Sequence, residues 1–431
     1  MATQAGIAKS LREIASALES GLVNPRILQQ VENFIFNFPM AEVLNCPEDK
    51  LSKCPPEILE EIFQYLDSED LKSVVLVNKR LCDVGKKPKF WYKSMVRLQS
   101  LDAGVGFLRS EREVRRLEVV GLGSEESLEL MTAMSSGSSL REVSLQDCPL
   151  DLVEPRMLSV AFSNLVKVNL SNSNIGEDQV GALFSLMDSG CKIKSLNLEE
   201  VDLSNVAPEL LSSTSRLVEV NFSATLMTDE QTRVMWDAIE EEDCNFESLE
   251  MTGVNLGNVG IDALVKVATT VGKIGIGNTS ITPLQATAII TAFDANVALQ
   301  EVDMSDLDLS AIEARFFAKV FSRTKKLNLA NAGLTPDQVS HLLEGQTHEG
   351  ILEDLDLSAN QLHLLNAELM ATSMNKMRSV TLVDSGITMS QVKENCEIIQ
   401  SLYSLNSGGS DSQGKFGENL SHHFLGLSHF A

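Results

Sequence analysis

The chain has 431 residues, with 60 acidic against 35 basic side chains, and its formal net charge is −25. A charge this negative repels nucleic acid phosphates and anionic lipids, so DNA, RNA and membrane surfaces are not expected partners and basic proteins are favoured. Hydrophobic residues make up 43% and charged residues 22%, the proportions of an ordinary globular protein.

The N-terminus and the longest uncharged run both argue against export or membrane insertion. Lys9, Arg12 and Glu13 lie within the first twenty residues, which contain no continuous apolar core of a secretory signal. Residues 274–293 are uncharged but contain too many polar side chains for a membrane span. We therefore expect a cytoplasmic or nuclear protein.

The 7 cysteines are scattered and odd in number, which predicts neither a disulfide framework nor a zinc cluster. No structural metal and no cofactor are expected. His422, His423 and His429 near the C-terminus also lack the spacing of a metal site.

Residues 1–47 are predicted to form a helical N-terminal extension, with amphipathic stretches around 7–18 and 26–36. In the following segment, a first helix is expected to begin near Pro56. Ser68 is a suitable N-cap for a second helix, and a third is expected from Lys79 to Lys93. The apolar side chains of the first helix fall on one face at helical spacing: Ile58, Leu59, Ile62, Phe63 and Leu66.

Residues 48–95 resemble the F-box, a small helical domain. The matching positions are Pro55, Glu57, Ile58, Leu59, Ile62, Phe63, Leu66, Leu71, Val77, Arg80 and Trp91. Cys54, Asn78 and Leu81 depart from the consensus, so weaker binding than in a typical member is expected. The resemblance implies docking to a Skp-type adaptor, which links a substrate receptor to a cullin. The residues expected to contact the adaptor are Pro55, Pro56, Ile58, Leu59, Ile62, Leu66, Val77 and Trp91. An ordinary three-helix bundle is the alternative.

A helical linker is predicted over residues 96–113, and a leucine-rich-repeat pattern then recurs eleven times over residues 114–403. Every second repeat starts 53 residues after the last, at Leu140, Ile193, Phe246, Leu299 and Leu352. Alternation of short and long repeats resembles the ribonuclease-inhibitor class. The ninth position of the repeat departs from that class, because the expected Asn or Cys occurs only as Cys148 and Asn360. A buried asparagine ladder should therefore be partial.

Capping boxes indicate where the helices of the long repeats begin. A hydroxyl residue and a Gln three positions later can each satisfy a backbone N–H at the helix start. The boxes are Thr228 to Gln231, Thr282 to Gln285, Thr335 to Gln338 and Thr388 to Gln391, with a glycine variant at Gly176 to Gln179. Each long repeat is predicted to be strand, turn and capped helix, which gives an α/β solenoid with a parallel sheet on its concave side. Residues 404–431 are predicted to be a disordered tail.

Strand side chains alternate, so the third, fifth and seventh residues of each repeat, counted from its first apolar residue, should line the concave face. Acidic residues are densest there in the late repeats, and we expect four carboxylates to cluster around Lys326. The predicted client-binding residues are Glu301, Asp303, Lys326, Asn328, Asp354, Asp356 and Ser358. A basic segment of a client protein would suit them. Solvated acids spread over a strongly acidic chain are the alternative.

The sequence contains no phosphate-binding glycine loop, nucleophile elbow or zinc-protease motif, so the protein is not expected to be an enzyme. The combined resemblances imply the substrate-recognition subunit of a cullin-RING ubiquitin ligase. One alternative is a GTPase-activating leucine-rich-repeat protein, for which Arg116 and Arg141 are the candidate arginines. Another is a scaffold that binds the adaptor without a role in ubiquitin transfer.

Overall fold

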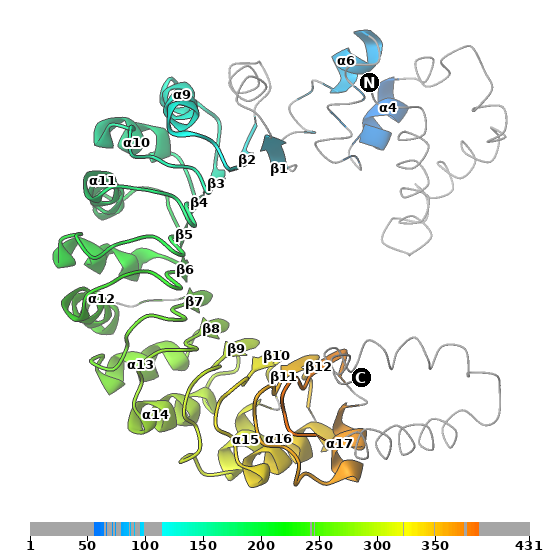
Figure 1. The fold of residues 1–431 in the computed structure, drawn as a ribbon. Helices are drawn as coiled ribbons and strands as arrows, with labels where there is room; N and C mark the ends of the chain where they lie inside the picture. Colours follow the sequence, from blue (N-terminus) through cyan, green and yellow to red (C-terminus); the bar gives the residue numbers. More distant parts are fainter. Residues whose placement is uncertain are drawn as a thin grey trace, which may run out of the picture. The chain divides into compact units, whose positions relative to one another are not determined.

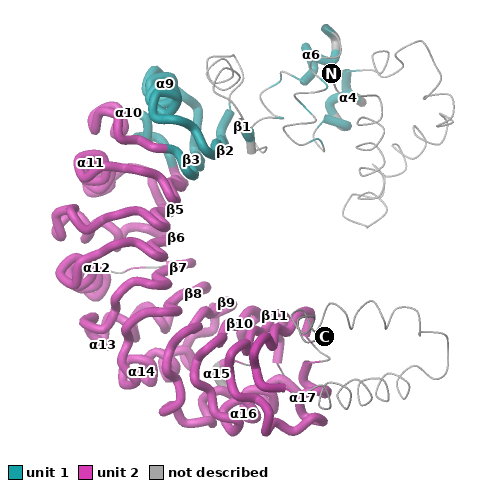
Figure 2. Tube along the Cα trace, in the orientation of Figure 1, with its two compact units in different colours: residues 1–148, 160–165 teal, residues 149–159, 166–431 magenta. Residues whose placement is uncertain are grey.

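The computed structural model describes residues 56–63, 66, 71, 74, 79–85, 87, 90, 95–98, 114–241, 244, 246–321, 323–348, 350–374 and 377–387. Predictions for residues 1–55 and 388–431 lie outside this part of the chain. The chain divides into two compact units, shown in Figure 2. Residues 1–148 and 160–165 form the first unit, and residues 149–159 and 166–431 form the second.

Two helices of the F-box-like segment are described in the first unit, α4 (Pro56–Phe63) and α6 (Lys79–Gly85). Leu59, Phe63 and Phe90 are buried, and the two aromatic rings pack edge to face with centroids 5.9 Å apart. The predicted start at Pro56 is confirmed. The prediction that the third helix runs to Lys93 is wrong, because α6 ends at Gly85, where glycine favours termination and Pro88 cannot continue the helix.

Among its described residues the first unit also has three parallel strands and one long helix: β1 (Met95–Leu98), β2 (Arg116–Val120), β3 (Glu142–Gln146) and α9 (Ser124–Ser135). Val96 of β1 lies opposite Leu117 of β2, and both are fully buried. The helical linker predicted from residue 96 is therefore corrected over 96–98. A strand forms there because β2 offers an edge whose backbone groups need hydrogen-bond partners.

Nine strands are described in the second unit, and each pairs in parallel with the next in sequence order. They are β4 (Lys167–Asn169), β5 (Ser195–Asn197), β6 (Glu219–Asn221), β7 (Ser248–Glu250), β8 (Lys273–Gly275), β9 (Glu301–Asp303), β10 (Lys326–Asn328), β11 (Asp354–Asp356) and β12 (Ser379–Thr381). Figure 1 shows these strands on the inner side of this unit and its helices on the outer side. The predicted α/β solenoid with a parallel sheet is confirmed.

The helices on the outer side are longest in the long repeats, as the capping boxes predict. They are α11 (Glu177–Asp188), the 3₁₀ helix η2 (Pro208–Arg216), α12 (Asp229–Glu241), α13 (Ile261–Ala268), α14 (Pro283–Phe293), α15 (Arg315–Phe321), α16 (Pro336–His348) and α17 (Ala367–Met374). A further helix, α10 (Pro155–Phe162), lies where the chain passes between the units.

One residue after each strand adopts the left-handed conformation that turns the chain away from the sheet. It is the eighth residue of the repeat, and it has a positive φ as Asp147, Asn172, Glu200, Ala224, Asn278, Asp306, Asn331, Ala359 and Asp384. Glycine fills the same position as Gly121 and Gly253. Since L-residues seldom adopt this conformation, its recurrence shows that the repeat dictates the turn.

Where the ninth residue of the repeat is Asn or Thr, its side chain donates a hydrogen bond at the same turn in one of two ways. Asn360 is buried, and its Nδ2 donates to the carbonyl of Leu329 in the preceding repeat at 2.8 Å. Thr225 and Thr279 donate instead to a carbonyl of their own repeat, at 2.7 Å in each case. A short hydroxyl side chain cannot span two repeats, so the asparagine ladder is partial, as predicted.

Candidate functional site

The charged residues predicted to bind a client lie side by side on strands β9, β10 and β11. Lys326 is in register with Glu301 on one side and with Asp354 on the other. Two residues further on, Asn328 is in register with Asp303 and Asp356. The parallel pairing thus produces two rows of side chains across the concave face, because alternate residues of each strand point the same way.

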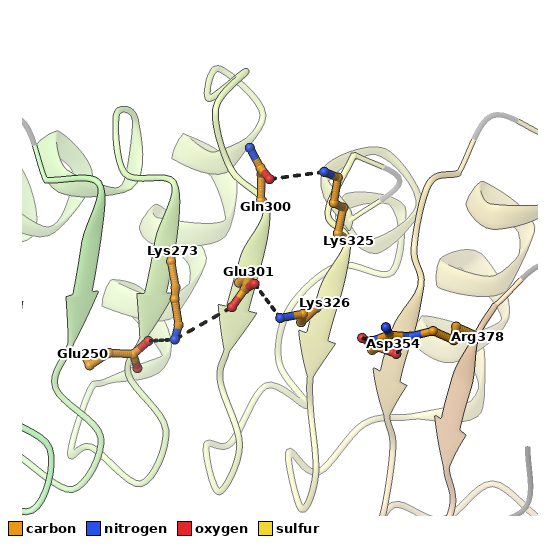
Figure 3. A network of polar contacts seen from close by, with 8 residues as sticks. All are labelled: Glu250, Lys273, Gln300, Glu301, Lys325, Lys326, Asp354 and Arg378. Carbon is orange, nitrogen blue, oxygen red and sulfur yellow. Dashed lines mark hydrogen bonds and ion pairs between the residues drawn. The ribbon is translucent and has the colours of Figure 1, made fainter. Parts of the chain in front are cut away.

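Ion pairs join the lysines of the first row to carboxylates of neighbouring strands, Glu301 in the same row and Glu250 in the second row (Figure 3). Lys326 Nζ lies 2.7 Å from Glu301 Oε1. Lys273 Nζ lies 3.1 Å from Glu250 Oε1 and 3.7 Å from Glu301 Oε2, so Glu301 is shared by two lysines.

Asp354 does not contribute to this lysine-centred group, because it forms an ion pair with Arg378. The expected cluster of four carboxylates around Lys326 is therefore corrected. Arg378 was missed because it occupies the second position of its repeat, outside the positions predicted to face the groove. Its long side chain nevertheless reaches the carboxylate on the neighbouring strand.

The second row combines exposure to the groove with a structural role. Asp303 Oδ1 accepts hydrogen bonds from Ser305 N at 2.9 Å and from Ser305 Oγ at 2.7 Å. Asp356 Oδ1 accepts from Ser358 N at 2.9 Å, and Asn328 Oδ1 accepts from Ala330 N at 3.1 Å. One side-chain oxygen of each residue therefore holds the turn that follows its strand.

Glu250 is subject to opposing electrostatic effects. Burial raises its pKa, attraction to Lys273 opposes that rise, and repulsion from Asp303 and Glu301 adds to it. The pKa of Lys273 is also raised, because the charges of Glu250 and Glu301 and their hydrogen bonds outweigh the effect of burial on the ammonium group. The lysine is thus well compensated, whereas Glu250 remains harder to ionise than a free glutamate.

These side chains line a single open hollow. Six of the seven residues predicted to bind a client contribute to its wall; the exception is Ser358, whose Oγ accepts a hydrogen bond from Val383 N at 3.2 Å. Glu199, Asn221, Glu250 and Lys273 extend the lining toward earlier repeats. Glu199, Glu250 and Lys273 fit the rule that the third, fifth and seventh residues face inward, but were left out of the predicted site.

The residues predicted to contact an adaptor differ in exposure. Pro56 is exposed, while Ile62 and Leu66 are half-buried. Leu59 is fully buried, so its side chain belongs to the core of the helical segment and offers no surface. The backbone of Ile58 lies in α4, but its side chain is not described. The structure does not describe Pro55, Val77 or Trp91.

The two arginines considered for a GTPase-activating role are both engaged. Arg116 Nε lies 2.7 Å from Glu142 Oε2. Arg141 Nη1 donates to the carbonyls of Leu140 and Asn164, at 3.0 and 3.3 Å. An arginine that stabilises phosphoryl transfer must instead be presented to the nucleotide of a partner.

Searches for a metal site and for a membrane span were limited to the described residues. No group of three or more His, Cys, Asp or Glu side chains there could hold a metal ion. None of the described helices combines the length and apolar character needed to cross a bilayer. Cys148 is buried in the first unit, and burial raises the pKa of its thiol, which disfavours the reactive thiolate.

Comparison with known proteins finds similarity for both parts of the chain. Residues 51–97 match the F-box-like family. The ribonuclease inhibitor of Mus musculus is 25% identical over 281 residues, which cover 61% of this chain and 56% of that protein. The ribonuclease inhibitor of Sus scrofa is 24% identical over 305 residues, covering 68% and 56%. The chain thus spans about half the length of these curated relatives. It combines an F-box-like domain with leucine-rich repeats similar to those of ribonuclease inhibitors.

Proposed function

We propose that the protein is the substrate-recognition subunit of a cullin-RING ubiquitin ligase. The observation that carries the proposal is the F-box-like match at residues 51–97 followed by a repeat array with a charged, hollowed concave face. F-box domains generally bind Skp-type adaptors, and the array would hold the client. The chain would bring two proteins together and leave the transfer of ubiquitin to other subunits.

The client surface in this proposal is the hollow over strands β6–β12. Carboxylates outnumber cations among the residues that line it. Asp303 and Asp356 have no ion-pair partner within the part of the chain that the structure describes. A segment of the client that carries Lys or Arg would complement this surface. Such exposed charges act mainly by raising the association rate in a salt-dependent way.

The proposal is tested by purifying the full chain from cells in which the proteasome and cullin neddylation are both inhibited. Co-purification of adaptor and cullin together with stabilised clients is expected. Capture of the adaptor without cullin would instead favour an adaptor-bound scaffold, and capture of neither would overturn the proposal. Stimulated GTP turnover by a captured GTPase would favour the GTPase-activating alternative.

Variants at the two surfaces separate the two binding roles. Replacement of Pro56 and Ile62 by Ala should abolish adaptor co-purification, with the exposed Asp83→Ala in α6 as the control. Leu59 is left intact, because truncating a buried leucine costs about 2–5 kcal/mol and would unfold the segment. Client capture should fall instead when Asp303 and Asp356 are both changed to Asn. Asn already holds the same turn at Asn328, so this change removes charge and preserves the fold.

A further inference from the structure

Strand β8 differs from its neighbours at the positions that face the groove. The fifth and seventh residues of its repeat are Gly275, which ends β8, and Gly277 in the turn that follows. The other strands of the second unit place Asn, Glu, Asp or Thr at the fifth position, for example Asn221 in β6 and Asn328 in β10. Side chains are therefore compatible with the fold at this position, and their absence from β8 opens space on the concave face.

Carboxylates from both neighbouring strands use this space. A Cβ atom added to Gly275 would overlap Oε2 of Glu250, which leans over β8 from β7. A Cβ atom added to Gly277 would lie 3.0 Å from Oδ1 of Asp303, which approaches from β9. The glycines thus allow two acidic side chains to converge over one strand. Figure 3 shows Glu250 pointing toward β8, where it meets Lys273.

Compensation of these two carboxylates is incomplete. Glu250 has Lys273 as an ion-pair partner. Asp303 is stabilised only by hydrogen bonds from the neutral groups of Ser305 among the described residues. Repulsion between the two acids contributes to the raised pKa of Glu250. Adding one positive charge between them would relieve this repulsion without displacing an existing ion pair.

We propose that Glu250 and Asp303, converging over Gly275 and Gly277, form a site that receives one lysine or arginine side chain of a client protein. Both carboxylates line the open hollow, so an extended segment crossing the strands can reach them. This inference rests on the proposed role as a client receptor and specifies where that client's basic side chain binds. The side-chain oxygens of Glu250 and Asp303 lie over the backbone at Gly275 and Gly277, where any side chain at those positions would displace them.

The test uses the full chain and fluorescein-labelled octalysine as the probe, with fluorescence anisotropy as the readout. Gly275→Ala leaves the net charge unchanged but forces Glu250 out of its place. The φ of Gly275 lies outside the left-handed region, so alanine fits the backbone. Glu250→Gln removes the charge and keeps the shape. Each variant should weaken octalysine binding about tenfold, which corresponds to about 1.4 kcal/mol.

Matched controls separate the proposed site from the general negative field of the chain. Gly181→Ala makes the same change in helix α11, where a Cβ atom would meet only Leu210 at 3.8 Å. Glu129→Gln removes one exposed charge from the middle of α9. Both controls should bind octalysine within about twofold of the wild-type protein, since neither position lies on the strands that carry Glu250 and Asp303 and a single exposed charge is screened by salt.

Two outcomes would overturn the proposed site. One is wild-type binding by Gly275→Ala in a sample whose circular dichroism and unfolding midpoint are unchanged. The other is an equal loss in Glu129→Gln and Glu250→Gln, which would show that octalysine senses net charge alone. Adaptor and client capture by the wild-type chain is measured in parallel. If that capture succeeds while Gly275→Ala and Glu250→Gln bind octalysine like the wild-type protein, the proposed site at Glu250 and Asp303 is wrong and the proposed receptor function stands.

Discussion

Gln285 Nε2 donates a hydrogen bond to the backbone carbonyl of Val259, 2.8 Å away in the preceding repeat. The same side chain accepts from Thr282 N through Oε1 at 2.7 Å, which caps its own helix. Gln231 and Gln338 make equivalent contacts to Val206 and Ile312, both at 2.6 Å. Each of these three capping boxes therefore also ties one repeat to the one before it.

This double role predicts that Gln285→Glu destabilises the array. A carboxylate keeps the cap acceptor but loses the donor and places negative charge against the carbonyls of Leu256 and Val259. The expected loss is about 2 kcal/mol or more, measured as a lower midpoint in urea unfolding. Gln300→Glu is the control, because Gln300 is exposed and accepts from Lys325 at 3.3 Å. Equal midpoints for the two variants would contradict the inter-repeat tie.

Glu250→Gln is expected to stabilise the protein slightly at neutral pH. The folded-state pKa of Glu250 is raised by burial and neighbouring acids, so the folded state binds the proton more tightly than the unfolded state. The protonated form of Glu250 therefore stabilises the folded state, and this stabilisation is lost as the pH rises through the folded pKa. Glutamine does not titrate, so the variant avoids that loss. Thermal unfolding from pH 4 to 8 should show a gain below about 1 kcal/mol that shrinks toward acid pH. A gain that grows toward acid pH would contradict this sign.

Glu219→Gln should show the opposite behaviour. Burial would raise the pKa of Glu219, but hydrogen bonds from Lys167 and Ser195 and the charge of Lys167 lower it overall. Lys167 Nζ donates to both carboxylate oxygens, at 2.9 and 2.8 Å. The ionised group therefore stabilises the fold above its unfolded pKa, and the effect is lost as the pH falls through the folded pKa. The variant should unfold at a lower temperature at pH 7, with a loss below about 1 kcal/mol because the pair is partly exposed. Equal unfolding temperatures for the variant and the wild-type protein at pH 7 would show that the ion pair between Lys167 and Glu219 does not stabilise the fold.

Ala224→Gly is predicted to stabilise the array, although glycine usually weakens regular structure. Ala224 has a φ of 54°, in the left-handed region, where a Cβ atom costs about 1–2 kcal/mol. Glycine removes this cost, but its unfolded state has more conformational entropy, which lowers stability by about 0.5–1 kcal/mol. A net gain in stability of roughly 0.5 kcal/mol remains. Chemical denaturation measures it. Ala286→Gly, in the interior of α14, should lower stability in the same assay.

The repeat period and the helix starts were readable from the sequence. The 53-residue interval and the boxes at Thr228, Thr282 and Thr335 depend on local spacing, and the structure has a helix after each. The concave positions of Glu301, Lys326 and Asp354 were also predictable, because side chains alternate along a strand whatever its neighbours do. The register between strands was predictable as well, because equivalent positions of successive repeats lie opposite each other.

Only the tertiary structure decided which charges meet. Arg378 pairs with Asp354 because a long side chain can reach across strands from a position that the alternation rule assigns elsewhere. Glu250 and Asp303 converge because Gly275 and Gly277 leave room between two neighbouring strands. Leu59 turned inward because residues such as Phe63 and Phe90 complete a core around it. Side-chain reach and burial depend on residues distant in the chain, and local spacing carries no information about either.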